Sequence, residues 1–388
     1  MKVFLLGMVW RNAWRHKLRS ALTLLGLVVA LLAFGLLLTV VDAWYQGVNA
    51  SSDKRLVTRH KVSLVFTLPQ NYLGKIRAVD GVRLTTYENW FGGIYKEPKN
   101  FFPQFAVDAR TYLQVYPEFR LTDAERDAFL RDRKGAIVGR RTAENYGLKV
   151  GDNITLKGTI FPGEWNFVLR GIYSGGREST DESLFFFHWE YLDETVRQRY
   201  GGRRTAQIGL FVSEVEDADD IARIAQTIDA QFANSHAETR SETEKSFQLG
   251  FVAMSEALVA AIRAVSYLVI LIILAVMANT MAMTARERRA EYATLRALGF
   301  APPFLAALIF AESLLLALAG GVLAVVLTYP VAAFFGAAVS KFIPHFVVGP
   351  QTPLLQMAAA LAVGLLAAFI PAWRAARVNI VSGLRAVA

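Results

Sequence analysis

Four long apolar segments constrain this chain more than any other feature. Residues 21–41, 265–283 and 354–373 contain no charged side chain, and residues 304–340 contain only Glu312. The hydrocarbon core of a bilayer is about 30 Å thick and is crossed by about 20 helical residues. Hydrophobic residues make up 54% of the chain, above the roughly 45–50% that is usual for soluble proteins. The sequence therefore predicts four transmembrane helices.

Basic residues gather beside these segments and predict their orientation. The stretches before the first segment, between the second and third, and after the fourth hold 12 basic and 2 acidic residues, while the whole chain carries +9. Cytoplasmic loops are enriched in Lys and Arg, so we expect a multi-pass protein of the cytoplasmic (inner) membrane with both termini in the cytoplasm. These stretches suit contact with anionic membrane lipids. The soluble part has no basic excess, which argues against nucleic-acid binding.

About 200 residues separate the first and second segments, enough for a domain with its own core. The predicted fold class is an α-helical membrane protein with four transmembrane helices plus a large α/β extracytoplasmic domain inserted between helices 1 and 2. The predicted parts are a cytoplasmic amphipathic lead-in (1–20), helix 1 (21–45), the extracytoplasmic domain (46–242), a stalk with helix 2 (243–284), a cytoplasmic loop (285–303), helix 3 (304–338), a short extracytoplasmic loop (339–353), helix 4 (354–373) and a cytoplasmic tail (374–388).

Periodicity predicts several elements inside the large domain. Strands are expected at residues 83–87, 104–107, 136–138, 153–157, 166–173 and 206–212, and helices at 123–132, 141–146 and 217–232. The aromatic-rich stretches 89–95 and 101–105 fit either a buried core or an apolar outer vestibule. Residues 243–263 also read as helical, and no Gly-Pro breaker separates them from the second apolar segment. One continuous helix of about 40 residues would be about 60 Å long and would project as a stalk; an interfacial helix with a hidden break is the alternative.

No recognisable catalytic constellation occurs in the sequence. A P-loop, an H-E-x-x-H pair and a G-x-S-x-G elbow are all missing, and the chain has no cysteine for thiol catalysis or metal thiolates. The histidines are scattered without metal-ligand spacing: His16, His60, His188, His236 and His345. We therefore expect no catalytic residues, no metal site and no cofactor on this chain.

The charged stretch 286–299 lies between the second and third apolar segments. On a helix, Tyr292, Leu295 and Gly299 fall near one face. Glu287 and Glu291 form a like-charge pair at i, i+4, which slightly disfavours an isolated helix. Such a pair is easier to explain if a basic groove on another protein receives it. An ordinary basic loop resting on lipid headgroups explains the composition equally well, and the residues alone leave both interpretations open.

Four stretches together resemble the MacB/FtsX-like (type VII) family of ABC transporter permeases. WRNAWRHKLRSALTLLGLVVA resembles the lead-in and first span, and AENYGLKVGDNITLKG followed by FVLRGIY resembles the core of the outer domain. RERRAEYATLRALGF with LIFAESLLLALAGGVLA resembles the coupling helix and third span, and PAWRAARVNIVSGLRA the closing segment. The resemblance covers both ends and all membrane segments, and is weaker over residues 46–135.

The resemblance implies a permease subunit that works with a separate ABC ATPase subunit, which would hold the ATP and Mg²⁺. A second permease subunit, identical or related, would complete the complex, and a periplasmic adaptor or a lipoprotein is a further candidate partner. The residues implied in ATPase coupling are Glu287, Arg288, Glu291, Tyr292, Leu295, Arg296, Leu298 and Gly299.

Small residues and one acid inside the spans carry further expectations. Close helix approach in membranes uses small residues, and the candidates for a dimer seam are Gly26, Gly35, Ala275, Ala278 and Ala282; packing within the chain is the alternative. Glu312 is an acid inside a span, which is by default a functional hypothesis. It follows the helix start at Pro302, where the helix dipole favours negative charge, and we expect a structural or coupling role.

The expected function is mechanotransmission: ATP hydrolysis inside would reshape the outer domain and so drive export or extraction of a hydrophobic or amphipathic substrate, such as a lipid, lipoprotein, peptide or drug. The alternative is an FtsX-like signalling module that activates cell-wall hydrolases, although such relatives tend to have smaller outer domains. A membrane-anchored enzyme is disfavoured by the missing site residues.

Overall fold

The structure is a computed structural model that describes residues 7, 11–12, 14–45, 48, 51–177, 179–201, 205–339 and 346–377. The chain divides into two compact units, a helical bundle and an α/β domain. Parts of the predicted lead-in, residues 340–345 with His345, and the tail from residue 378 lie outside the described residues.

The bundle contains the apolar segments. Its helices are α2 (Lys17–Trp44), α11 (Glu256–Glu287), α12 (Arg289–Ala297), α13 (Pro302–Val339) and α14 (Gln351–Ala376). Within the described residues, four of these, all but the short α12, are long and apolar enough to cross a membrane. The predicted set of four spans is confirmed.

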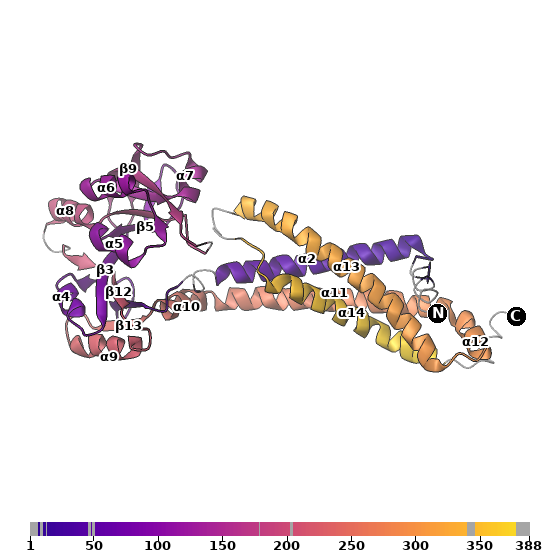
Figure 1. The fold of residues 1–388 in the computed structure, drawn as a ribbon. Coiled ribbons are helices and arrows are strands. Elements are labelled where there is room, and N and C mark those ends of the chain that lie inside the picture. The colour runs from indigo at the N-terminus through magenta and orange to yellow at the C-terminus, as the bar shows by residue number, and fades with distance from the viewer. Residues whose placement is uncertain are drawn as a thin grey trace. The chain divides into compact units, whose positions relative to one another are not determined.

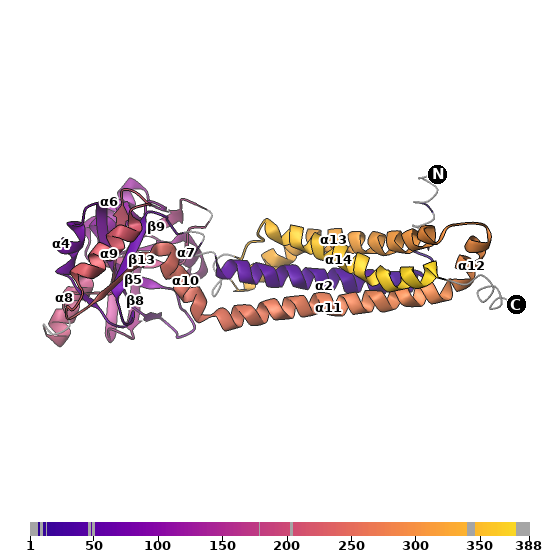
Figure 2. The same cartoon turned by 90° about the horizontal axis from the view of Figure 1, so that it is seen from below.

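Helices α2 and α14 form the middle of the bundle, since each packs along both α11 and α13 (Figures 1 and 2). The backbones of α13 and α14 approach closely at small residues. A Cβ placed on Gly321 would lie 2.8 Å from Ala360 Cβ, and one on Gly364 would lie 2.7 Å from Ala317 Cβ. Such close contact is the usual basis of helix association in lipid, where no hydrophobic force drives helices together.

The predicted continuous 40-residue helix is wrong. Helix α10 (Glu244–Met254) ends before Ser255, and α11 begins at Glu256. Ser255 has φ −107° and ψ 12°, outside the α-helical region. Neither Gly nor Pro occurs at this position, which is why the sequence pattern gave no sign of the break. The break itself agrees with the alternative expectation of a helix with a hidden break. Helix α10 belongs to the α/β unit and not to the bundle.

The α/β domain comprises many short elements. Its strands are β1 (Arg55–His60), β2 (Leu68–Pro69), β3 (Val82–Trp90), β4 (Gly93–Tyr95), β5 (Gln104–Val107), β6 (Phe119–Arg120), β7 (Gly135–Gly139), β8 (Asn153–Gly158), β9 (Gly163–Gly175), β10 (Phe185–His188), β11 (Gln207–Ile208), β12 (Leu210–Val215) and β13 (Thr239–Thr243). Its helices, besides α10, are α4 (Tyr72–Arg77), α5 (Ala109–Val115), α6 (Asp123–Arg131), α7 (Arg140–Tyr146), α8 (Trp189–Tyr200) and α9 (Ile221–Gln231).

One large mixed sheet organises this domain, in the order β13-β1-β12-β3-β5-β10-β7-β9-β8-β4. The predicted α/β class is therefore confirmed. The strands predicted at 104–107 and 153–157 match β5 and β8, whereas the strand predicted at 206–212 is split into β11 and β12 at Gly209. Strands β1, β10 and β13 were not predicted, because their residues RLVTRH, FFFH and TRSET lack the alternation of apolar and polar side chains that indicates a strand.

Aromatic side chains dominate the core of the domain. Phe91, Trp165, Phe167 and Phe187 are completely buried, and the Phe91 ring meets the other three edge to face at centroid distances of 5.2 to 6.4 Å. Such pairs add about 0.5–1.5 kcal/mol each beyond area burial. The stretches 89–95 and 101–105 mainly supply this core, although Trp90 and Phe101 stay exposed.

Candidate functional site

Helix α12 lies at one end of the bundle, between α11 and α13 (Figure 1). It starts where Arg288, with φ −99° and ψ 16°, interrupts the α11 helix. It ends at Gly299, whose φ of +94° lies in the left-handed region. The Phe300 amide donates to the Leu295 carbonyl at 3.1 Å and the Gly299 amide to the Arg296 carbonyl at 3.1 Å. These two bonds form the Schellman motif that closes a helix at a glycine.

One face of α12 is buried in the bundle. Tyr292 is 1% exposed and belongs to the same apolar cluster as Leu305 and Ile309 of α13. Arg288 is also buried, and its Nη1 lies 2.8 Å from Glu312 Oε2. Each charge of this pair compensates the other, because either one buried alone in an apolar surrounding would be strongly destabilising. Glu312 thus has a specific cationic partner, which the sequence analysis missed.

The acids of α11 and α12 are paired with arginines from before the first span. Arg19 Nη1 and Nη2 donate to the two oxygens of Glu287 at 2.7 and 2.9 Å, a bidentate geometry. Arg15 is bonded to Glu291, and Arg288 Nε donates to the same carboxylate at 3.1 Å. Partial burial raises the pKa of Glu291, but the bonds from Arg15 and Arg288 outweigh it and leave the pKa below its ordinary value.

These contacts correct part of the predicted docking surface. Arg288 and Tyr292 are buried within the bundle and are not available to a partner. The like-charge pair Glu287 and Glu291 is matched inside the chain, so it does not by itself call for a basic groove on another protein. Arg296 is half-buried, and its Nη1 donates to the Ala376 carbonyl of α14 at 3.1 Å.

The exposed end of α12 has an apolar character. Leu298 is 71% exposed and Phe300 is 42% exposed, on either side of Gly299. The Phe300 ring stacks on Phe304 with centroids 4.9 Å apart, which holds the projecting loop against the start of α13. Of the residues predicted to contact a partner, Glu287, Leu298 and Gly299 are exposed, and Leu295 is half-buried.

The candidate seam residues fall into two groups. Gly35 is buried, and a Cβ on it would lie 2.1 Å from Gln356 Nε2 of α14. Gly35 therefore packs within the subunit, which corrects its assignment to a dimer seam. Gly26 is half-buried and faces Ile273 Cδ1 at 3.6 Å from its notional Cβ, so it too contacts the chain's own α11. Ala275 is exposed on α11, and Ala278 and Ala282 are half-buried there, so these alanines stay candidates.

Gln356 is a polar centre inside the bundle that the sequence analysis did not single out. Its Nε2 donates to the Leu31 carbonyl of α2 and to Thr328 Oγ1 of α13, both at 2.8 Å. One amide thereby joins three helices. A lone amide in an otherwise apolar span was the signal available in the sequence, because a buried polar group in lipid needs a partner.

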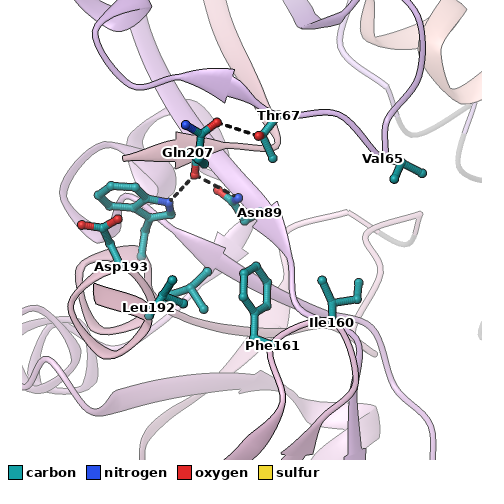
Figure 3. Close-up of a pocket in the computed structure, with 10 residues that line it drawn as sticks. Val65, Thr67, Asn89, Ile160, Phe161, Leu192, Asp193 and Gln207 are labelled. Atoms are coloured by element: carbon teal, nitrogen blue, oxygen red, sulfur yellow. Dashed lines mark hydrogen bonds between the residues drawn. The ribbon is translucent and has the colours of Figure 1, made fainter. Parts of the chain in front are cut away.

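A cavity of about 250 Å³ in the α/β domain has a mixed lining. Leu192 and Phe161 form an apolar side, and Asn89 and Gln207 a polar side (Figure 3). Asn89 Nδ2 donates to the Gln207 carbonyl at 3.1 Å. These residues offer binding of a small apolar group and no nucleophile–base arrangement. Among the described residues, no cluster of His, Cys, Asp or Glu has the arrangement of a metal site.

Three of the described histidines, His188, His60 and His16, contact other residues of the chain. His188 is buried, with Nε2 2.7 Å from the Phe129 carbonyl, and desolvation lowers its pKa. His60 Nδ1 accepts from the Val62 amide at 3.2 Å. His16 Nε2 lies 3.7 Å from Glu287, beside the Arg19 pair.

Comparison with known proteins matches both units. The MacB-like periplasmic core domain model matches residues 20–231, more than half of the chain, and the model of the FtsX-like permease C-terminal region matches residues 263–380. An uncharacterised ABC transporter permease of Methanocaldococcus jannaschii is 24% identical over 408 aligned positions, covering 97% of this chain and 96% of the relative.

Two other similar proteins align with only about half of this chain. An uncharacterised ABC transporter permease protein of Mycobacterium tuberculosis is 27% identical over 197 residues, 51% of this chain and 22% of that protein. The periplasmic region of MacB from Actinobacillus actinomycetemcomitans aligns over 53% of this chain and 95% of that structure, with 8% identity and a TM-score of 0.36. The match of the MacB-like periplasmic core domain to more than half of the chain, together with that of the FtsX-like permease C-terminal region, shows that the chain belongs to the MacB/FtsX-like family of ABC transporter permeases.

Proposed function

We propose that this chain converts ATP hydrolysis by a separate ATPase subunit into a conformational change of its α/β domain. The observation that carries the proposal is α12: a nine-residue helix that is fixed to the bundle on one face and ends in the exposed residues Leu298 and Phe300. In this arrangement α12 and both termini lie in the cytoplasm, and the α/β domain lies outside the cytoplasmic membrane. ATP and Mg²⁺ are bound by the ATPase.

The contact with the ATPase centres on the projecting loop of residues 298–300. Exposed apolar side chains on an anchored turn suit an apolar pocket, because hot spots of binding are buried side chains at the centre of an interface. The carboxylates of Glu287 and Glu291 are about two-fifths exposed and contribute to the polar rim, with Leu295 and Arg296 beside them.

The substrate is hydrophobic or amphipathic, in keeping with a domain that acts beside a membrane. A lipid, lipoprotein, peptide or drug would be extracted or exported as the α/β domain changes conformation. A second permease subunit completes the complex, with the exposed Ala275 and its neighbours Ala278 and Ala282 at the contact of the two subunits. A periplasmic adaptor or a lipoprotein is the third component.

The docking proposal is tested by placing a charge on the exposed loop. Leu298→Glu in the tagged full-length chain should reduce the amount of co-purified ATPase about tenfold or more, since burying an unpaired carboxylate in an apolar pocket is unfavourable. Val62→Glu is the matched control, because Val62 is 73% exposed and Leu298 71%. Equal recovery of the ATPase with both variants would refute docking through this loop.

A further inference from the structure

The basic residues before the first span have a specific structural partner. Arg19 engages both oxygens of Glu287 at 2.7 and 2.9 Å, and Arg15 is bonded to Glu291. Arg19 lies in the first turn of α2 and Arg15 just before it, while Glu287 ends α11 and Glu291 lies in α12, so the two contacts flank the break between α11 and α12. Positive charge at this position is usually explained by membrane topology and lipid headgroups, which would not require such matched geometry.

The contacts continue into the bundle interior. Glu291 accepts from Arg288 Nε at 3.1 Å, and Arg288 Nη1 donates to Glu312 Oε2 at 2.8 Å. Arg15, Glu291, Arg288 and Glu312 thus form an unbroken row of alternating charges. It runs from the residues before α2, through α12, to the buried face of α13. We call this row, together with the Arg19–Glu287 pair, the inner ion-pair chain.

We propose that the inner ion-pair chain couples α2 mechanically to α12. Displacement of α12 by the ATPase would then move α2 directly as well as α11. Arg15 and Arg19 are positioning residues in this scheme. The proposal rests on the proposed function, because it needs an ATPase that acts on α12. Within the chain, the Arg15–Glu291 contact adds a route that does not pass through the covalent connection between α11 and α12, whereas the Arg19–Glu287 pair holds α2 to the last residue of α11.

The geometry supports a mechanical role more than a stabilising one. Exposed ion pairs add little to stability, and Arg15 and Glu291 are about half exposed. A bidentate Arg–carboxylate pair nevertheless fixes orientation as well as distance. Helix α11 makes few direct contacts with α13, so movement of α11 reaches α13 through α2 and α14. The ion-pair chain connects α12 to α2 and α13 together.

Charge reversal separates this role from docking and from lipid binding. The full chain is reconstituted with its co-purified ATPase in vesicles of neutral and anionic phospholipid, and ATPase retention and permease-stimulated ATP hydrolysis are measured. Arg19→Glu should keep ATPase retention within about twofold and lower the stimulation about fivefold or more. Glu287→Arg should lower the stimulation by a similar factor, measured per bound ATPase because Glu287 also lies at the rim of the proposed docking surface. The double variant Arg19→Glu/Glu287→Arg should restore stimulation to within about twofold of the natural chain.

Lys17→Glu is the matched control, because Lys17 is exposed, undergoes the same change of charge and lies half a turn away. It should behave like the natural chain. If Lys17→Glu lowers stimulation as much as Arg19→Glu, headgroup attraction explains the basic segment and the proposal is overturned. Failure of the double variant to recover, with an unchanged unfolding midpoint, overturns it as well. A natural chain that neither retains nor stimulates an ATPase contradicts the proposed function instead.

A covalent link tests whether the contact must stay closed. The chain has no cysteine, so Arg19→Cys/Glu287→Cys can be joined by a short bifunctional thiol reagent without side reactions. The linked protein should stimulate ATP hydrolysis more than the unlinked double variant. Loss of stimulation on linking would show that the two helices must separate, which contradicts transmission through a closed contact.

Discussion

Arg288, at the break between α11 and α12, and Glu312 of α13 form a buried ion pair, with Nη1 and Oε2 2.8 Å apart and both side chains less than a tenth exposed. The pair explains how an acid is tolerated inside an otherwise apolar segment. Arg288 is also the residue whose non-helical backbone, with φ −99° and ψ 16°, separates α11 from α12.

Removing one member of this pair should be costly. Glu312→Gln leaves the buried Arg288 guanidinium with only the partly exposed Glu291 as counter-charge, and we expect a loss of about 1–3 kcal/mol of unfolding free energy. The double variant Arg288→Met/Glu312→Gln should recover most of this loss. Thermal unfolding in detergent, followed by circular dichroism, measures both. A double variant no more stable than Glu312→Gln would contradict the pairing.

The contact between Gly35 and Gln356 makes Gly35 irreplaceable in a way that Gly26 is not. Gly35→Ala would push the Gln356 amide away from Leu31 and Thr328, and should cost about 1–3 kcal/mol, as overpacking does. Gly26→Ala meets only an ordinary contact at 3.6 Å and should be neutral, or stabilising by about 0.5–1 kcal/mol because alanine favours helix. Unfolding midpoints of the two variants provide the comparison, and similar values would count against the Gln356 contact.

Arg55 joins three parts of the α/β domain. Its Nε lies 2.7 Å from Glu244 of α10 and its Nη1 2.7 Å from Glu118, and its guanidinium stacks 4.3 Å from the Tyr116 ring centroid. Arg55→Met should cost about 3–5 kcal/mol, because two mostly buried carboxylates lose their counter-charge. Arg83→Met is the control, since Arg83 is more than half exposed in its pair with Glu214. If urea unfolding gives Arg55→Met and Arg83→Met the same loss of unfolding free energy, the two ion pairs of Arg55 contribute no more than an exposed pair.

Glu88 should make the stability of the α/β domain depend on pH. Burial raises its pKa to about 7 from an ordinary 4.5, against an opposing hydrogen bond of 2.6 Å from Tyr112. A raised carboxyl pKa contributes stability below about pH 4.5 that is lost as pH rises through about 7. Glu88→Gln should therefore match the natural chain at pH 4 and exceed it at pH 8 by on the order of 1–3 kcal/mol.

Glu125 serves as a control, because its pKa is lowered whereas that of Glu88 is raised. Partial burial raises the pKa of Glu125, but hydrogen bonds from Thr122 and the Ile172 amide outweigh burial and leave the pKa below its ordinary value. Its contribution to stability is present above the unfolded-state pKa and disappears as pH falls through the folded-state value. Glu125→Gln should thus be less stable than the natural chain at pH 7. A shared direction for both variants at neutral pH would contradict these assignments.

Features set by neighbouring residues could be predicted from the sequence, whereas contacts between residues far apart in the chain could not. Apolar runs of about twenty residues identify spans without any tertiary information, and the predicted helix at 123–132 matches α6 because its capping box of Thr122 and Glu125 is local. The Arg19–Glu287 contact joins residues 268 positions apart, and no periodicity reports such a pair. Arg288 could not be recognised as buried, because a cationic residue in a basic stretch is ordinarily exposed.

The central claim is that residue 298 and the α/β domain lie on opposite sides of one membrane, and labelling of single cysteines tests it most directly. Leu298→Cys and Val62→Cys, each the only thiol in the chain, are exposed to a membrane-impermeant maleimide in intact cells and after permeabilisation. We predict labelling of residue 62 in both conditions and of residue 298 only after permeabilisation. Equal labelling of both residues in intact cells would place the loop and the domain on the same side and contradict the proposed transmission across the membrane.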